Sequence, residues 1–428
     1  MTPLRLLCVL LYGVLLLGLV TLNGALLALA IPLMIYLGAG LLYEPPLPQL
    51  TATRTLSSDR VSPAVPVAVK LALTNTGNRL EEVFVEDLFP PALELIDGSP
   101  RLLTALEPGA TVEVEYTLRG QRGIYHFPGV QVTASEYLGL FRKRLLLPAT
   151  SQLFILPEVA RMRRVDIRPR QTRVYSGFIP ARQGGPGVEF FGVREYQPGD
   201  PTRWINARAT ARATDSLFVN EFEQERVADV GLILDGRALS DVRTRTGSLF
   251  EHGVQAAAAM ADALIGQGNR VGLLIYGNGA DWTLPGYGKL QRERILRALA
   301  RAKTADLPAF ESLELMPIRV FPARSQLVLI SPLLERDLPV LVRLRARQYQ
   351  LIVISPDPVS FEQESLGMGK PVELAGRIAR VERKLLLRKL QQVGIAVVDW
   401  HVDTPFHHVT HVALSRSPQA VQGPGIGS

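Results

Sequence analysis

The chain has 428 residues, so we expect two or three folded units rather than a single domain. Charges of both signs are interspersed around a net charge of +7, a pattern typical of a solvated surface rather than of a nucleic-acid-binding protein. Cys8 is the only cysteine, which excludes disulfides, thiolate metal sites and cysteine nucleophiles from the rest of the chain.

Two uncharged apolar segments stand near the N-terminus. Residues 6–22 and 25–43 each approach the roughly 20 residues that a helix needs to cross a bilayer, and Asn23 and Gly24 form a turn between them. We predict a transmembrane hairpin over residues 1–45, with residues 6–43 in the bilayer. A cleaved signal peptide is the less favoured alternative, because no small-residue cleavage site precedes a polar start.

Positive charges predict the orientation of this hairpin in the cell membrane. Arg5 precedes the first helix, and Arg54 and Arg60 follow the second, whereas the turn carries no charge. The positive-inside rule then places both ends, and the globular body, in the cytoplasm.

Residues 50–156 have the pattern of a β-sandwich of the immunoglobulin or fibronectin kind. Alternating apolar residues separated by Gly and Pro turns mark short strands at 65–73, 83–85, 112–118, 124–127 and 130–133. For such a domain we expect a role as a spacer or docking module.

Residues 157–226 differ in kind from this domain. Arg161–Arg173 contains six arginines and a single acid, and close to a membrane such a cluster can attract anionic lipid headgroups. A solvated connector is the alternative. Nucleic-acid binding is disfavoured, because no aromatic residues interleave with the arginines.

From residue 227 to residue 414, short apolar runs alternate with amphipathic helices. The runs lie at 230–234, 271–276, 327–330, 351–354 and 395–398. This alternation predicts a doubly wound α/β domain, with a parallel sheet covered on both faces and ligands at the carboxyl ends of its strands. Residues 415–428, rich in Gly, Pro and Ser, are expected to be a disordered tail.

A longer motif spans residues 187–203, with the sequence GVEFFGVREYQPGDPTR, and continues through Ile205 and Asn206 to residues 208–212. With this signature, and with RGIY at 122–125 and EYLGLF at 136–141, the chain resembles the membrane-anchored family called domain of unknown function 58. The resemblance implies an N-terminal hairpin, a β domain and a von Willebrand factor A-like domain. It also implies a MoxR-type AAA+ ATPase as partner, in the assembly or remodelling of protein complexes.

Charged and aromatic residues lie close together in the signature. We expect a partly buried network in which arginines pair with carboxylates and stack on rings, and a partner-binding groove is the alternative. A hydrolase built on the carboxylates is less favoured, because neighbouring arginines lower carboxylate pKa values. The candidate residues are Glu189, Phe190, Arg194, Glu195, Tyr196, Gly199, Asp200, Arg203 and Arg208.

The resemblance also bears on metal binding. Von Willebrand factor A domains hold a divalent cation on an Asp-x-Ser-x-Ser motif after the first strand and on a later acid. Here only Asp235 matches, since Arg237 and Leu239 replace the two hydroxyls and Ser331 stands where the later acid is expected. An arginine beside Asp235 can neutralise the carboxylate without an ion. We therefore predict a vestigial site, without metal or cofactor.

The C-terminal histidines are the last candidates. His407 and His411 would share a face only in a helix, but we predict an extended segment at 409–414 and expect all four histidines, His401, His407, His408 and His411, to be structural or exposed. No phosphate-binding loop, dinucleotide fingerprint or nucleophile elbow occurs. The sequence therefore predicts a non-catalytic, membrane-tethered interaction protein. The alternative is an adhesion or ligand-binding protein with the α/β domain outside the cell.

Overall fold

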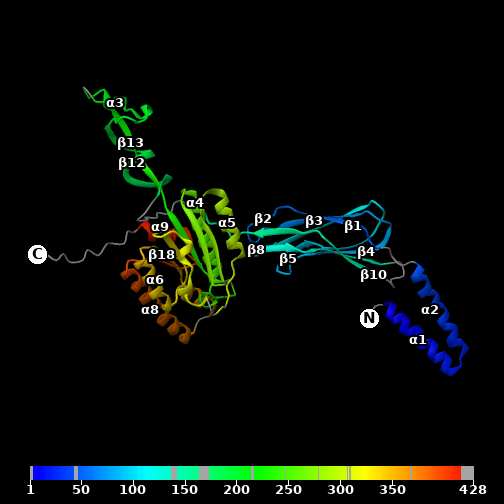
Figure 1. Ribbon diagram of the computed structural model, residues 1–428. Coiled ribbons are helices and arrows are strands. Elements are labelled where there is room, and N and C mark those ends of the chain that lie inside the picture. Colours follow the sequence, from blue (N-terminus) through cyan, green and yellow to red (C-terminus); the bar gives the residue numbers. More distant parts are fainter. Residues whose placement is uncertain are drawn as a thin grey trace. The chain divides into compact units, whose positions relative to one another are not determined.

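A computed structural model describes residues 3–42, 47–135, 142–162, 173–213, 216–245, 247–277, 279–305, 307, 310–366 and 369–415 (Figure 1). For residues 3, 41–42, 173–189, 191, 222–226 and 411–415 only the backbone is described. The chain divides into two compact units, Met1–Leu156 and Pro157–Ser428. The predicted tail beyond Ser415, and most of the arginine cluster, lie outside the described residues.

The first unit begins with two packed apolar helices, α1 (Pro3–Thr21) and α2 (Gly24–Leu42). The segment Leu4–Thr21 is long and apolar enough to cross a membrane, whereas the apolar part of α2, Gly24–Gly40, is shorter. Asn23 accepts a hydrogen bond from the amide of Ala25 at 3.0 Å. A Cβ atom at Gly18 would lie 2.9 Å from Leu27, so glycine permits the close approach of the two helices.

The rest of this unit is built from three sheets, in which the strands pair antiparallel except for β2 (Arg60–Val61) and β11 (Ser151–Ile155), which pair parallel. In β3, Val67, Val69, Leu71 and Leu73 alternate with more exposed residues and enter the core, as the period of a half-buried strand requires. The first sheet has the order β1 (Leu50–Leu56), β3 (Val67–Asn75), β7 (Thr111–Gly120), β5 (Leu93–Gly98). The second has the order β10 (Arg142–Leu147), β9 (Gly129–Ser135), β4 (Leu80–Leu88), β6 (Arg101–Leu106). A third joins β2 (Arg60–Val61), β11 (Ser151–Ile155) and β8 (Gly123–Phe127).

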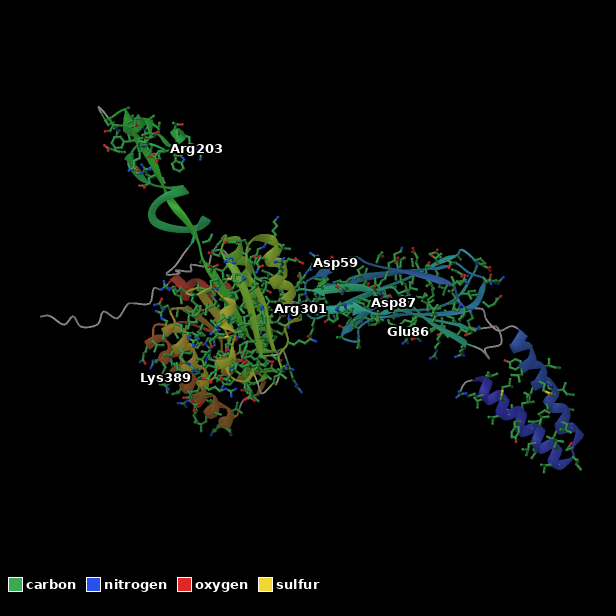
Figure 2. The ribbon with its side chains drawn as sticks, in the orientation of Figure 1. Asp59, Glu86, Asp87, Arg203, Arg301 and Lys389 are labelled. Atoms are coloured by element: carbon green, nitrogen blue, oxygen red, sulfur yellow. The ribbon has the colours of Figure 1, made fainter. Side chains whose placement is uncertain are left out.

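Arg54, one of the positive charges after the second helix, is buried in this unit and paired with a carboxylate. Its side chain is 1% exposed and forms an ion pair with Asp87, to which Nε donates at 3.0 Å. Tyr116 donates to the same carboxylate at 2.7 Å, and the guanidinium lies 4.8 Å from the centre of the Phe127 ring. Asp87 and its neighbour Glu86 are labelled in Figure 2. Arg54 therefore has a structural role in the folded β domain, which the sequence did not reveal.

In the second unit, residues 157–162 form no helix or strand, and a strand pair begins at Arg173. The long strand β12 (Arg173–Glu195) pairs antiparallel with β13 (Phe218–Val227), with several irregularities of register. Between them lie the short helices η1 (Thr202–Trp204) and α3 (Ala207–Thr210). The signature therefore forms the end of a β-hairpin and its loop.

A six-stranded sheet forms the centre of the α/β domain. Its order is β16 (Gly279–Gly286), β15 (Arg270–Gly277), β14 (Asp229–Asp235), β17 (Gln326–Ile330), β18 (Gln350–Pro356), β19 (Ala396–Trp400). The helices are α4 (Leu249–Gly266), α5 (Gly288–Arg301), α6 (Leu338–Ala346), α7 (Pro358–Leu366), α8 (Lys370–Gln392) and α9 (Phe406–Ser415). Ile233 packs in the core on the side of α6 and α8, whereas Leu234 lies toward α4, so the sheet is covered on both faces.

Two predictions for this domain are wrong. The sheet is not wholly parallel, because β16 returns antiparallel along β15, and the positive φ angles of Gly277 (143°) and Gly279 (77°) permit that tight reversal. Residues 409–414 are helical rather than extended, since α9 begins directly after Pro405. Proline tolerates a position at a helix start, where its missing amide leaves no hydrogen bond unmade.

Candidate functional site

The strand order of the α/β domain reverses beside β14. From this strand the chain runs to β15 on one side, and later to β17 on the other. In doubly wound sheets such a switch point opens a crevice at the carboxyl ends of the strands, where ligands bind. Here those ends are Asp235 and Ile330, so Asp235 lies where the site of this fold class is expected.

The crevice is filled by the side chain of Arg237, which is 2% exposed. Its Nε and Nη2 donate to Asp235 at 2.9 and 2.7 Å, and its backbone amide donates to the same carboxylate at 3.1 Å. The chain turns through residue 236 in between, so the two side chains face one another after two residues. The predicted pairing of Arg237 with Asp235 is present.

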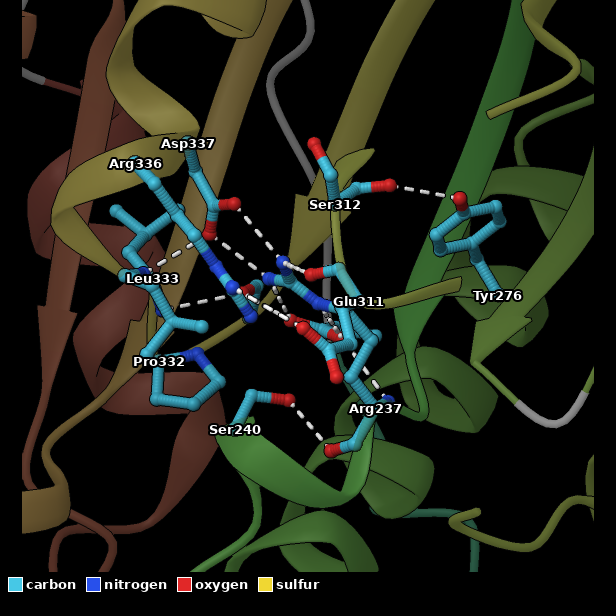
Figure 3. Close-up of polar contacts among 12 residues, drawn as sticks. Arg237, Ser240, Tyr276, Glu311, Ser312, Pro332, Leu333, Arg336 and Asp337 are labelled. Carbon is cyan, nitrogen blue, oxygen red and sulfur yellow. Dashed lines mark hydrogen bonds and ion pairs between the residues drawn. The ribbon is translucent and has the colours of Figure 1, made fainter. Parts of the chain in front are cut away.

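A second carboxylate completes the cluster. Asp337 accepts from Nη1 and Nη2 of Arg237 at 2.9 and 2.8 Å, and the carbonyl oxygen of Glu311 accepts from Nη1 at 2.9 Å (Figure 3). A guanidinium has five N–H groups, and all five of them have an acceptor here. Asp337 was not identified from the sequence as part of this site. Asp337 is far from Asp235 along the chain, and no sequence pattern indicates that the two residues lie close together.

The two carboxylates are held by further donors. Ser331 donates to Asp235 at 2.6 Å, and the amide of Leu334 donates to Asp337 at 2.9 Å. Asp337 also precedes the first residue of α6, where the helix dipole stabilises a negative charge. Two carboxylates and one guanidinium leave the cluster with a net charge of −1, and these donors compensate for it.

The protonation of the cluster follows from its contacts. Burial by itself lowers the pKa of Arg237, but the hydrogen bonds to Asp235 and Asp337 outweigh burial and raise the pKa above its usual value. Burial also raises the pKa of nearby Tyr276, whose hydroxyl donates to the carbonyl of Ser312 at 2.7 Å. A hollow of about 10 Å³ beside Asp235 and Ser331 holds a single water at most. The arrangement is that of a closed ionic lock.

The signature loop has its own ion pair. Arg194 donates from Nη1 and Nη2 to the two oxygens of Asp200 at 2.8 and 2.7 Å, and the amide of Gln197 donates to Asp200 at 2.8 Å. Hydrogen bonds from Arg194, and then from the Gln197 amide, lower the pKa of Asp200. Gly199 has a φ of 108°, so this turn needs glycine. The arginine–carboxylate pairing expected for the signature occurs at these two residues.

Asn206 fixes the other half of the loop. Its side chain accepts from the amide of Ala209 at 3.0 Å, as an N-cap of α3, and donates to Asn220 at 2.7 Å. Its own amide donates to the carbonyl of Phe218 at 2.8 Å. This local role explains a polar residue at the end of the motif.

The remaining signature residues are not gathered into one buried network. Phe190 is 62% exposed, Arg208 is exposed on α3, and Arg203 lies 5.9 Å from the ring of Trp204. The backbone amide of Tyr196 donates to Leu217 at 2.7 Å, and Glu195 pairs in register with Phe218. The side chain of Glu189 lies outside the described residues.

A third polar cluster lies at the ends of β18 and β19. Ser360 donates to Asp357 at 2.8 Å and lies 3.2 Å from Nδ1 of His401, and that same nitrogen lies 3.3 Å from Asp357. In a nucleophilic triad the serine and the acid contact opposite nitrogens of the imidazole, so this arrangement is not one. Arg383, 9% exposed, donates to Asp399 at 2.6 Å and joins this cluster to α8.

No group of three or more His, Cys, Asp or Glu side chains placed to hold a metal ion occurs in the part of the chain that the structure describes. His407 and His408 lie together with ring centres 4.3 Å apart, on α9.

Comparisons with known proteins show similarity to a protein family, but the proteins matched have no described activity. Residues 192–368 match the model of the family described as "Protein of unknown function DUF58". The chain is 34% identical over 125 residues to the uncharacterized proteins Rv1480 of Mycobacterium tuberculosis and Mb1516 of Mycobacterium bovis. These alignments cover 29% of this chain, which spans 38% of the length of each relative.

The similarity of this chain to solved structures is too low to support an inference about its fold or function. The FixG-related protein from Vibrio parahaemolyticus aligns with a TM-score of 0.19 and 11% identity, over 26% of this chain and 98% of that chain. The cupredoxin domain of amoB from Nitrosocaldus yellowstonii aligns with the same score and identity, over 26% of this chain and 90% of that chain.

Proposed function

We propose that this chain is a membrane-tethered, non-catalytic interaction protein. In this proposal its C-terminal unit is a von Willebrand factor A-like domain that docks with a MoxR-type AAA+ ATPase during the assembly or remodelling of other proteins. The observation that carries the proposal is the buried position of Arg237 between Asp235 and Asp337. Groups that satisfy one another at the switch point favour a structural lock there, and leave function to the exposed surface.

The membrane tether is supported by α1, whose segment Leu4–Thr21 is long and apolar enough to cross a bilayer. We propose that α2 returns the chain to its starting side. The orientation is argued from Arg5 before α1 and from Arg54 and Arg60 after α2. A cytoplasmic body is also the location in which an ATPase partner finds its nucleotide.

We assign the docking surface to the signature hairpin, which consists of β12, β13 and the loop between them. Phe190, Val193 and Leu217 are 62%, 42% and 48% exposed, although they are large and apolar. The ion pair of Arg194 with Asp200 fixes the loop beside them. Exposed apolar side chains next to a rigid polar loop are typical of protein-binding surfaces.

The test is co-purification of the full-length protein, gently solubilised from its native cells, followed by identification of bound ATPases. One variant, Phe190→Ser with Leu217→Ser, removes exposed apolar groups. A second, Arg194→Ala with Asp200→Ala, releases the loop. Leu290→Ser, at a 65% exposed position on α5, is the matched control.

Recovery of an AAA+ ATPase by the wild type and by the control, but by neither signature variant, is the expected result. Recovery by all four proteins would keep the partnership and remove the hairpin from it. Capture of extracellular proteins, without any ATPase, would overturn the proposal in favour of a surface-exposed ligand-binding protein.

A further inference from the structure

Helix α8 presents an exposed apolar row that no other described element covers. Leu374, Ile378, Val381 and Leu385 are 59%, 54%, 59% and 51% exposed. The opposite face of the same helix is buried, with Leu387 and Leu390 in the domain core. In Figure 1 the helix lies at the periphery of the α/β domain.

The spacing of the row is that of a coiled-coil seam. The four residues follow one another at intervals of 4, 3 and 4 positions. At 100° per residue they span an arc of about 60°, narrower than the stripe of about 100° or more by which a helix packs on a broad apolar surface. A narrow row at alternating intervals of 3 and 4 packs against another helix, as a and d positions do. We call these four residues the α8 seam.

One flank of the seam carries a row of basic residues. Lys370, Arg377 and Lys384 recur there at intervals of seven, Gln391 follows them, and Arg388 occupies the next position of the seam itself. The side chains of Lys370, Arg377, Lys384 and Arg388 are exposed, and none of them makes a hydrogen bond or ion pair within the part of the chain that the structure describes. In heptad terms, Lys370, Arg377 and Lys384 occupy g positions, the positions that select a partner by its charge.

A groove continues the seam at Leu385. It has a volume of about 420 Å³ and separates α8 from the segments that follow β17 and β18. Its apolar walls include Leu333, Leu334, Val359, Ala379 and Leu386. The charged residues Glu335, Glu382, Arg383 and Lys389 also line it, with both signs present. A large side chain of a helix seated on the seam fits such a hollow.

We propose that the α8 seam binds an amphipathic helix of another protein, with apolar residues at its contact positions and acidic residues facing Lys370, Arg377 and Lys384. Two such α8 helices packed antiparallel would oppose their basic g positions, which disfavours an antiparallel second copy. The C-terminal residues 416–428 contain no acid and do not fit the basic flank. The narrow arc disfavours a membrane surface as occupant.

The inference goes beyond the proposed ATPase partnership and does not depend on it. It concerns α8, which follows the segment 192–368 that matches the family model. The seam would bind its helix whether or not the signature hairpin contacts an ATPase. The two proposals are therefore tested by different variants.

The test uses full-length protein in discs of neutral lipid and two labelled four-heptad peptides. One peptide carries Leu at a and d and Glu at e and g, and the other carries Lys at e and g. We expect the Glu peptide to bind the wild type at least about tenfold more tightly than the Lys peptide in fluorescence anisotropy titrations. Lys370→Glu with Arg377→Glu and Lys384→Glu should invert that preference.

A second variant tests the apolar row. Ile378→Ser with Val381→Ser should weaken the Glu peptide about tenfold or more, whereas Leu290→Ser and Lys289→Glu on α5 should leave it unchanged. Equal affinity for both peptides, or no effect of either seam variant, would overturn the inference.

Two further results would also overturn it. One is a dimer of the full chain that Ile378→Ser with Val381→Ser dissociates, which would assign the seam to a second copy. The other is slowed hydrogen exchange of α8 in discs of anionic lipid but not with the Glu peptide, which would assign the seam to a membrane.

Discussion

The guanidinium of Arg237 is joined to the carboxylate of Asp337, which lies one hundred positions later in the chain, by hydrogen bonds of 2.9 and 2.8 Å. The pair connects the loop after β14 to the start of α6 across the switch point. Since Arg237 also holds Asp235, the same side chain closes the crevice and fixes two loops of the domain.

Removing this arginine should destabilise the α/β domain strongly. Arg237→Ala leaves Asp235 and Asp337 buried without their counter-charge, and breaking a buried pair in this way costs about 3–5 kcal/mol. The measurement is the free energy of unfolding from urea denaturation of the full chain. The matched control is Arg301→Ala, whose partner Asp281 lies at 3.5 Å on the surface, where a pair contributes about 0–1 kcal/mol. Equal losses in the two variants would contradict the lock.

The residues of this cluster differ in whether their contacts could be predicted from the sequence. Asp235 and Arg237 are two residues apart after a strand, so their pairing followed from spacing and charge. Asp337 was missed, because tertiary packing and not spacing brings it there, and the expected acid was sought at Ser331 instead. Local patterns likewise predicted most helices of the α/β domain. They did not predict the pairing of β12 with β13, whose register is irregular and whose connecting loop contains two short helices.

Edges and ends of elements were less predictable than their centres. The antiparallel β16 depends on two glycines with positive φ, whose backbone conformation periodicity does not reveal. Helix α9 was predicted as a strand because Val409–Leu414 contains few strong helix formers and too few residues for a clear period. The ion pair of Arg54 with Asp87 was not predicted, because the two residues are 33 positions apart.

Two adjacent acids in β4 should differ sharply in their importance. Asp87→Ala leaves Arg54 buried and unpaired and removes the acceptor of Tyr116, so the free energy of unfolding should fall by about 3–5 kcal/mol. Glu86→Ala removes only the pair with Arg101, an arginine 64% exposed, and should cost about 0–1 kcal/mol. Thermal denaturation of the two variants measures the difference. Similar losses would show that Arg54 finds another partner.

His252 should make stability depend on pH. Its imidazole packs against Phe361 and Trp400 at ring distances of 5.6 and 6.3 Å, and burial lowers its pKa in the folded state. The unfolded chain, with a histidine pKa near ~6.5, then binds the proton more readily. Folding stability therefore falls as pH drops from above that value to below the folded pKa.

The measurement is unfolding free energy between about pH 5 and 7.5, with the imidazole followed by NMR. His252→Phe keeps a ring in place and should remove this part of the pH dependence, whereas His126→Gln, at an exposed position, should retain it. A folded-state pKa for His252 above the unfolded value would refute the argument.

Two glycines of the β15–β16 hairpin should respond differently to alanine. A Cβ atom at Gly277 would lie 2.1 Å from the carbonyl carbon of Gly236, and the φ of Gly277 is 143°, so alanine is both strained and crowded there. Because Gly236 precedes Arg237, the shift that relieves the contact also moves the arginine away from Asp235. We expect Gly277→Ala to lower the free energy of unfolding by about 3 kcal/mol or more.

The matched variant is Gly279→Ala, where φ is 77° but no atom lies within 4 Å of the added Cβ. Gly279→Ala should lower the free energy of unfolding by about 1–2 kcal/mol, from backbone strain alone. Urea unfolding of both variants, alone and combined with Arg237→Ala, measures the coupling. If the Gly277→Ala loss shrinks in the Arg237→Ala background, the close approach of Gly277 to Gly236 acts through the ionic lock, whereas full additivity would separate the two features.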